Sequence, residues 1–267
     1  MPLVRFPLAL LTVWCMLGAE KPVPRVAPLY SAASIVNAAD NQSGQLAPNA
    51  IGTIYGTNLA YSTAAVTQND IHGGALPIML GASETTVIIG NYPAALYYVS
   101  PTQINFLVPT NLLPVPVSVY VDVDALRGPL IPLTLGTAAP GLFQLDAHNV
   151  VATLANGSVV TPSSPAKPGD IVILWATGLG QTMPPADGFQ LPTAAAPLVA
   201  GANLSIVLDG TPVDLGAIDY AGVAPGFAGL YQINFTLPMS TGANPEIRLQ
   251  IDGATSIPQV HLPVMLN

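Results

Sequence analysis

Residues 103–106 read Gln-Ile-Asn-Phe, and the same four residues recur at 232–235, each time with a proline three positions later. A longer block precedes each copy, because residues 48–59 resemble residues 168–179. Matching blocks in a fixed order indicate an internal duplication. The chain is therefore expected to contain two related units.

A third pair of blocks, residues 87–93 and 206–212, lies between the other two in both copies. The second copy then carries about ten extra residues, around residues 214–225. These positions predict two homologous domains, at residues 27–137 and 138–267.

Within each copy, apolar residues alternate with polar ones. Valine occupies every second position of residues 117–123, and isoleucine or leucine every second position of residues 247–251. A period of two is typical of half-buried strands. The 28 prolines and 24 glycines disfavour long helices. The sequence predicts an all-β protein of two tandem immunoglobulin-like β-sandwich domains.

Charge and hydropathy exclude several classes of protein. The 267 residues include 6 Lys and Arg against 14 Asp and Glu, a formal net charge of -8, so nucleic acid is not expected as a partner. Half of the chain (51%) is hydrophobic, which excludes disorder driven by low hydropathy. Outside the N-terminus, the apolar runs are too short for a transmembrane helix in the mature chain.

The N-terminus reads as an export signal. Residues 1–19 combine Arg5, an apolar stretch and the small pair before Glu20, which predicts a signal peptide, followed by a linker at residues 20–26. The protein is therefore expected to be secreted, periplasmic or on the cell surface. Cys15 lies inside this signal, so the mature chain has no cysteine for a disulfide.

Several motifs resemble a known family. They are Ser-Ile-Val-Asn-Ala-Ala at 34–39, Ile-Tyr-Gly-Thr-Asn-Leu at 54–59, Pro-Ala-Lys-Pro-Gly-Asp at 165–170, and Tyr-Ala-Gly-Val-Ala-Pro-Gly at 220–226, which leads into Gly-Leu-Tyr-Gln-Ile-Asn-Phe. From about residue 27 to its end, the chain resembles the Solibacter-type family of uncharacterised C-terminal domains found mainly in acidobacteria. The resemblance implies export and the IPT/TIG branch of immunoglobulin-like folds. The family has no assigned activity.

Catalytic and metal-binding patterns are sparse. His72, His148 and His261 share no short spacing with one another or with another ligand type, which disfavours a zinc site and a catalytic triad. Gly178 and Gly180 follow a strand pattern without the third glycine of a dinucleotide-binding loop, and predict a tight turn. We expect neither enzymatic activity nor a cofactor.

Two groups of aspartates keep alternatives open. Asp122 and Asp124 fall on one face of a predicted strand, so an exported hydrolase using paired aspartates is one alternative function. Asp209, Asp214 and Asp219 surround the insertion of the second copy, and their oxygens are of the kind that calcium prefers. The sequence leaves calcium binding there undecided.

The leading expectation is a non-enzymatic structural or interaction module. Its partner would be a protein or a cell-envelope glycan, and a carbohydrate-binding module that uses the inserted region from Tyr220 to Tyr231 is the other alternative. Trp175 aligns with Tyr55 on an apolar strand and is expected in the core. The candidate interaction surface consists of Gln103, Asn105, Tyr220, Tyr231, Gln232 and Asn234.

Overall fold

The computed structural model describes residues 25–186 and 188–266, and these residues confirm an all-β protein. Their only helical segments are four 3-10 turns, η1 (Ala32–Ser34), η2 (Gln68–Asp70), η3 (Gly201–Asn203) and η4 (Leu215–Ala217). No helix in this part of the chain is long and apolar enough to cross a membrane. The predicted signal peptide lies outside the described residues.

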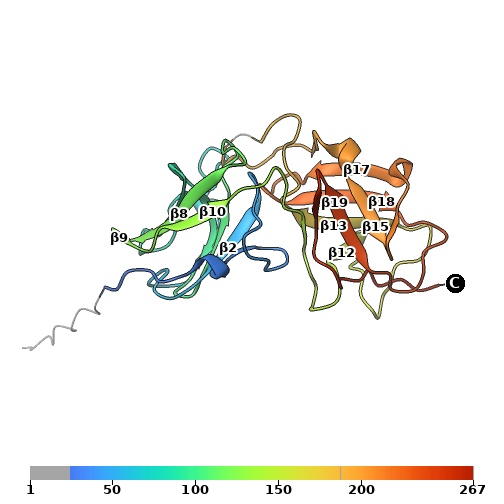
Figure 1. The fold of residues 1–267 in the computed structure, drawn as a ribbon, viewed down its shortest axis with the longest axis horizontal. Helices are drawn as coiled ribbons and strands as arrows, with labels where there is room; N and C mark the ends of the chain where they lie inside the picture. Colours follow the sequence, from blue (N-terminus) through green and yellow to red (C-terminus); the bar gives the residue numbers. More distant parts are fainter. Residues whose placement is uncertain (1–24, 187, 267) are drawn as a thin grey trace, which may run out of the picture.

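The first part of the chain forms two antiparallel sheets around one core (Figure 1). One sheet has the order β1-β2-β7-β6-β3, and the other has the order β10-β8-β4-β5 with β9 paired to β8. The core cluster draws side chains from both sheets, so the sheets face each other as a sandwich. The strands are β1 (Ile35–Asn37), β2 (Ile51–Tyr55), β3 (Ala64–Ala65), β4 (Thr86–Ile89), β5 (Tyr92–Pro93), β6 (Ala95–Val99), β7 (Gln103–Leu107), β8 (Pro116–Val123), β9 (Leu126–Arg127) and β10 (Ile131–Thr134).

The second part repeats this arrangement. One sheet has the order β11-β13-β18-β17-β14 with β12 paired to β13, and the other has the order β16-β15-β19-β20. A separate core cluster again joins the two sheets. The strands are β11 (Gly141–Leu142), β12 (Ala152–Leu154), β13 (Ile171–Thr177), β14 (Ala196–Pro197), β15 (Ser205–Leu208), β16 (Thr211–Pro212), β17 (Ile218–Val223), β18 (Tyr231–Thr236), β19 (Ile247–Ile251) and β20 (Ala254–Thr255).

The repeated sequence blocks pair in the same register in both parts. Strand β2 pairs with β7 so that Tyr55 lies opposite Gln103. Strand β13 pairs with β18 so that Trp175 lies opposite Gln232. Because a slip of one residue would turn every side chain to the other face, an equal register places equivalent residues on equivalent faces.

The two parts lie side by side (Figure 1), and a third apolar cluster joins them. The connection between β13 and β14 reaches across to the first part, where the backbone N–H of Leu76 donates to Phe189 (3.0 Å) and that of Leu191 donates to Gly74 (2.8 Å). Apolar burial and backbone pairing therefore both hold the junction. The cluster contains Leu76, Ala95, Leu107 and Ala228, with Ile51, Val66, Tyr97, Phe189 and Leu191 packed against it.

Candidate functional site

The outer faces of the β1-β2-β7-β6-β3 sheet and of the β11-β13-β18-β17-β14 sheet each carry two aromatic side chains, a glutamine and an asparagine. Inward positions of β7 and β18, such as Ile104 and Ile233, belong to the cores. The alternate positions point away from the core. We call the outward set Tyr55, Tyr98, Gln103 and Asn105 the first platform, and the set Trp175, Tyr220, Gln232 and Asn234 the second platform.

The two amides of each platform are joined by a hydrogen bond. Gln103 Nε2 donates to Asn105 Oδ1 at 2.8 Å, and Gln232 Nε2 donates to Asn234 Oδ1 at 2.7 Å. In each pair, the glutamine oxygen and the asparagine NH2 group make no side-chain hydrogen bond with another described residue. All four side chains are partly exposed. Each pair therefore offers one acceptor and one donor to a ligand.

An aromatic ring lies on either side of each amide pair. Tyr98 is the cross-strand partner of Asn105, and Tyr220 is that of Asn234. The Tyr220 hydroxyl donates to the Val223 carbonyl at 2.8 Å, and it lies only 2.5 Å from where a Cβ at residue 222 would be. Gly222 thus lets the Tyr220 ring lie close against the sheet. Partial burial raises the pKa of Tyr220, so its hydroxyl stays neutral.

Trp175 does not lie in the core, contrary to the expectation from sequence. The inward positions of β13 are Val172, Leu174 and Ala176, and alternation turns Trp175 to the outer face, where it is partly exposed. Tyr55, at the equivalent position, is 40% exposed. Both faces of β13 carry apolar residues, which hid the alternation in the sequence.

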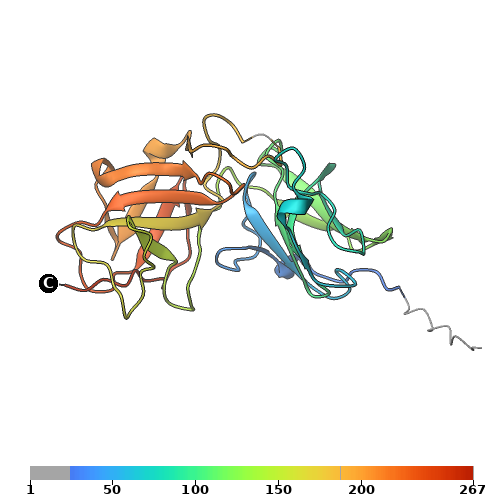
Figure 2. The same ribbon diagram turned by 180° about the vertical axis from the view of Figure 1, so that it is seen from behind.

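The second platform lies on an open sheet face. Beyond Trp175, the same face of β13 continues through Ile173 to Ile171, which is 42% exposed. Figure 2 turns this sheet, with its orange and yellow strands, toward the reader. The first platform is more enclosed, because Ile51 and Leu107 on the same face belong to the junction, and the Tyr55 hydroxyl donates to Asn41 Oδ1 at 3.0 Å.

Tyr231 must be removed from the candidate surface. It points inward from β18 and is completely buried, with burial raising its pKa. Its hydroxyl donates to the Gly180 carbonyl and accepts a hydrogen bond from Asn49 Nδ2 at 2.9 Å. It therefore has a structural role at the junction. The sequence could not show this, because Asn49 belongs to the other copy.

The turn between Tyr220 and Tyr231 also has a structural role. Strand β6 is followed closely by β7, whereas residues 224–230 separate β17 from β18. This longer turn packs on the first part: the Tyr97 hydroxyl donates to the Ala228 carbonyl, and a Cβ at Gly229 would lie 2.5 Å from Leu107. These contacts show that the turn helps to form the junction.

Asp122 and Asp124 do not form a carboxylate pair. Asp122 receives two hydrogen bonds of 3.0 Å from Arg127, and Asp124 lies beyond the end of β8, where it forms an ion pair with Arg25. Tyr61 also donates to Asp124. Each carboxylate is thus bound by its own cation, which is not the arrangement expected of paired catalytic aspartates.

The three aspartates near the insertion are only partly brought together. Asp209 accepts a hydrogen bond from the backbone of Glu246, and Asp214 accepts one from Gly216, both at 2.8 Å. Asp209 and Asp214 line one hollow of about 370 Å³, which Asp219 does not reach. Among residues 25–186 and 188–266, no three His, Cys, Asp or Glu side chains lie close enough to hold a metal ion.

His148 and His261 are joined through their backbones, whereas His72 lies in a turn of its own. His72 forms a tight bridge with Ala75, and His148 lies in a turn next to the Asp146 carboxylate. The backbone N–H of His261 donates to the His148 carbonyl at 2.7 Å, while the His261 Nδ1 atom lies 3.1 Å from the Asn244 carbonyl. Backbone contacts of this kind suit structural roles.

Comparisons with known proteins give only distant similarities. No protein-family model matches the chain, and no curated protein matches its sequence. A Bacteroides ovatus SGBP-B of a mixed-linkage glucan utilization locus, solved with a mixed-linkage heptasaccharide, aligns at 10% identity and a TM-score of 0.35, over 90% of this chain and 47% of that one. The chain thus spans about half the length of that protein.

Two further solved structures align with lower TM-scores. The surface glycan-binding protein PbSGBP-B from Prevotella bryantii aligns at 13% identity and a TM-score of 0.26, over 89% of this chain and 42% of that one. The tandem Ig repeats of Dlar align at 10% identity and a TM-score of 0.21, over 91% and 96% of the two chains.

Proposed function

We propose that the protein is an exported, non-enzymatic binding module that recognises a neutral carbohydrate through its two platforms. In this proposal, residues 27–137 and 138–267 are immunoglobulin-like domains that arose by duplication, within the acidobacterial domain family that the sequence resembles. The second platform is the principal site, because the first is bordered by the junction.

The observation that carries the proposal is the repetition of both platforms in one register. Opposite Tyr55 and Trp175 stand Gln103 and Gln232, each bonded to an asparagine two residues later. The cores do not require this, because the inward positions of the same strands already fill them. Partly exposed aromatic rings and paired amides in an equivalent place support a role in binding.

The chemistry of the platforms fits a sugar. An aromatic face supplies a flat apolar surface, against which the C–H face of a pyranose ring can pack. The free glutamine oxygen and asparagine NH2 group can accept from and donate to neighbouring hydroxyls. Neither platform contains a cation, and the acidic chain repels polyanions, which favours a neutral polymer.

Affinity electrophoresis tests the proposal. Residues 20–267 would be run through gels that contain neutral polysaccharides, including mixed-linkage β-glucan, xyloglucan and galactomannan, or acidic ones, such as alginate and pectin. We expect retardation by at least one neutral polymer. Trp175→Ala and Gln232→Ala should each weaken binding about five- to thirtyfold, since each removes a contact of roughly 1–2 kcal/mol.

The matched control is Tyr92→Ala. Tyr92 is 45% exposed and belongs to β5, outside both platforms, so its removal should leave binding unchanged. If every neutral polymer fails to retard the protein, or if Tyr92→Ala weakens binding as much as Trp175→Ala does, carbohydrate recognition by the platforms is wrong. Capture of an envelope protein that depends on Trp175 would instead identify the platform as a protein-binding surface.

A further inference from the structure

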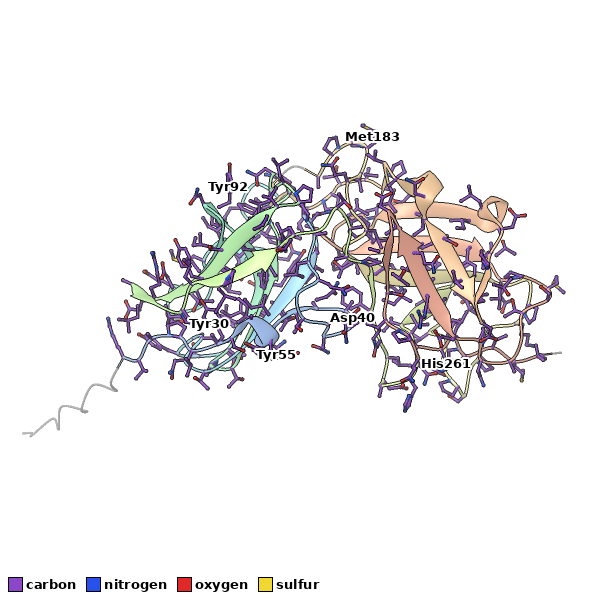
Figure 3. All side chains as sticks on the ribbon, in the orientation of Figure 1. Tyr30, Asp40, Tyr55, Tyr92, Met183 and His261 are labelled. Atoms are coloured by element: carbon purple, nitrogen blue, oxygen red, sulfur yellow. The ribbon has the colours of Figure 1, made fainter. Side chains whose placement is uncertain are left out.

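We propose a second binding site, for a small uncharged aliphatic molecule that carries an N–H or O–H group, in a cavity of the second part to which the first part contributes Asn49. The cavity measures about 360 Å³. It lies beside the β13–β14 connection, whose Met183 is labelled at the upper side of the junction in Figure 3. Its walls include Asn49, Thr182, Gln190, Leu191, Ala195 and Val223.

Asn49 supplies an acceptor that has no donor. Its side chain is only 5% exposed, and its Oδ1 atom makes no hydrogen bond with any described residue. It lines both this cavity and an adjoining hollow of about 150 Å³, which also shares Thr182, Pro185 and Ala186. A buried polar atom without a partner is uncommon and calls for a donor from outside the protein.

The orientation of the Asn49 amide follows from its neighbours. The Tyr231 hydroxyl has one proton, which it donates to the Gly180 carbonyl, so it can only accept from Asn49. Asn49 must therefore present its NH2 group to Tyr231 and leave Oδ1 as the unmatched atom. Exchanging the two amide atoms would place two acceptors against each other. The missing partner is thus an N–H or O–H donor.

The walls define the rest of the ligand. None of the described lining residues is ionisable or aromatic, and most are proline, alanine or other aliphatic residues. A charged ligand would lose its hydration without a compensating partner, and a stacked sugar would find no ring. Small-molecule sites are mostly apolar, contain a few polar groups and often lie between domains. This cavity therefore differs in chemistry from the platforms.

Two related amides isolate the role of the donor. N-methylacetamide carries one N–H group, whereas N,N-dimethylacetamide has nearly the same shape without it. Each would be titrated into isotope-labelled residues 20–267 while amide resonances are followed by NMR. We expect saturable shifts at the side-chain amides of Asn49 and Gln190, and binding of N-methylacetamide about five- to tenfold tighter than that of its analogue.

Substitutions that fill the cavity provide a second test of the proposed site. Ala195 is an exposed wall residue, so Ala195→Leu should weaken N-methylacetamide binding at least about tenfold without unfolding the chain. Ala155→Leu, at an exposed turn remote from the cavity walls, is the matched control and should change nothing. If Ala195→Leu disturbs the spectrum broadly, Ala194→Leu replaces it. Non-saturable shifts, equal affinity for the two amides, or binding that survives both cavity variants would each overturn the proposal.

Discussion

Tyr231→Phe tests whether the buried polar network holds the two parts together. The substitution removes only the hydroxyl, which is fully buried and bonded to Gly180 and to Asn49. The Gly180 carbonyl and the Asn49 NH2 group would both lose their partner. Each buried group left unsatisfied costs about 1–3 kcal/mol. Because the two losses share one site and are not fully additive, we expect the free energy of unfolding to fall by about 3 kcal/mol.

Denaturant and thermal unfolding of residues 20–267 would measure this loss. In a protein of this size, about 3 kcal/mol corresponds to a decrease of roughly 6–12 °C in the melting temperature. Tyr92→Phe is the control, because Tyr92 is exposed and its hydroxyl makes no hydrogen bond with another described residue, so its loss should cost under about 0.5 kcal/mol. If the two variants unfold alike, the network does not stabilise the junction and the reasoning is refuted.

Three further changes have defined outcomes. Burial raises the pKa of Asp40, so the folded state disfavours the charged form of this side chain. Asp40→Asn should therefore raise the free energy of unfolding at neutral pH and leave it unchanged at pH values well below 3.8, where Asp40 is protonated in both states. Denaturant unfolding across pH measures this difference. At Gly229, which has a φ of +72°, a Cβ would lie 2.9 Å from the Asn49 carbonyl, so Gly229→Ala should cost at least about 2 kcal/mol in thermal unfolding. Burial raises the pKa of Tyr30 to about 12, so stability should fall between pH 10.0 and 12 as the unfolded chain loses this proton first. Burial also raises the pKa of Tyr97 and Tyr231, so Tyr30→Phe should reduce this loss without abolishing it, and an equal loss in the variant would contradict the assignment to Tyr30.

The sequence predicts a strand where apolar and polar residues alternate along it. The valines of residues 117–123 alternate because one side of β8 faces a core, and Val119, Val121 and Val123 are indeed completely buried. The repeated Gln-Ile-Asn-Phe block likewise marked one strand in each part, β7 and β18. Both signals depend on the period of two, which any half-buried strand imposes on its sequence.

The position of Trp175 was not predictable from that pattern. Strand β13 is apolar on both faces, so alternation cannot tell the core face from the outer one. The register between β13 and β18 decides which face of β13 carries Trp175, because Trp175 lies opposite the polar residue Gln232. Once β13 is paired with β18, the polar partner Gln232 indicates which face of β13 is the outer one.

The roles of Tyr231 and of the inserted turn depend on contacts across the junction. Asn49 reaches Tyr231 from the other copy, and the Ala228 carbonyl accepts from Tyr97. Such contacts join residues far apart in sequence and leave no local periodicity. The same limitation hid the cavity, because Asn49 joins its walls from the first copy while the other described wall residues come from the second.

The fluorescence of Trp175 tests the central claim most directly. Only two tryptophans occur in the chain, and Trp14 belongs to the predicted signal, so the emission of residues 20–267 reports on the second platform alone. Titration with the neutral polysaccharide that retards the protein in affinity gels should give a saturable change in Trp175 emission. Gln232→Ala should shift the midpoint of this titration to about tenfold higher polysaccharide concentration. Binding of that polysaccharide with no change in Trp175 emission would contradict the account.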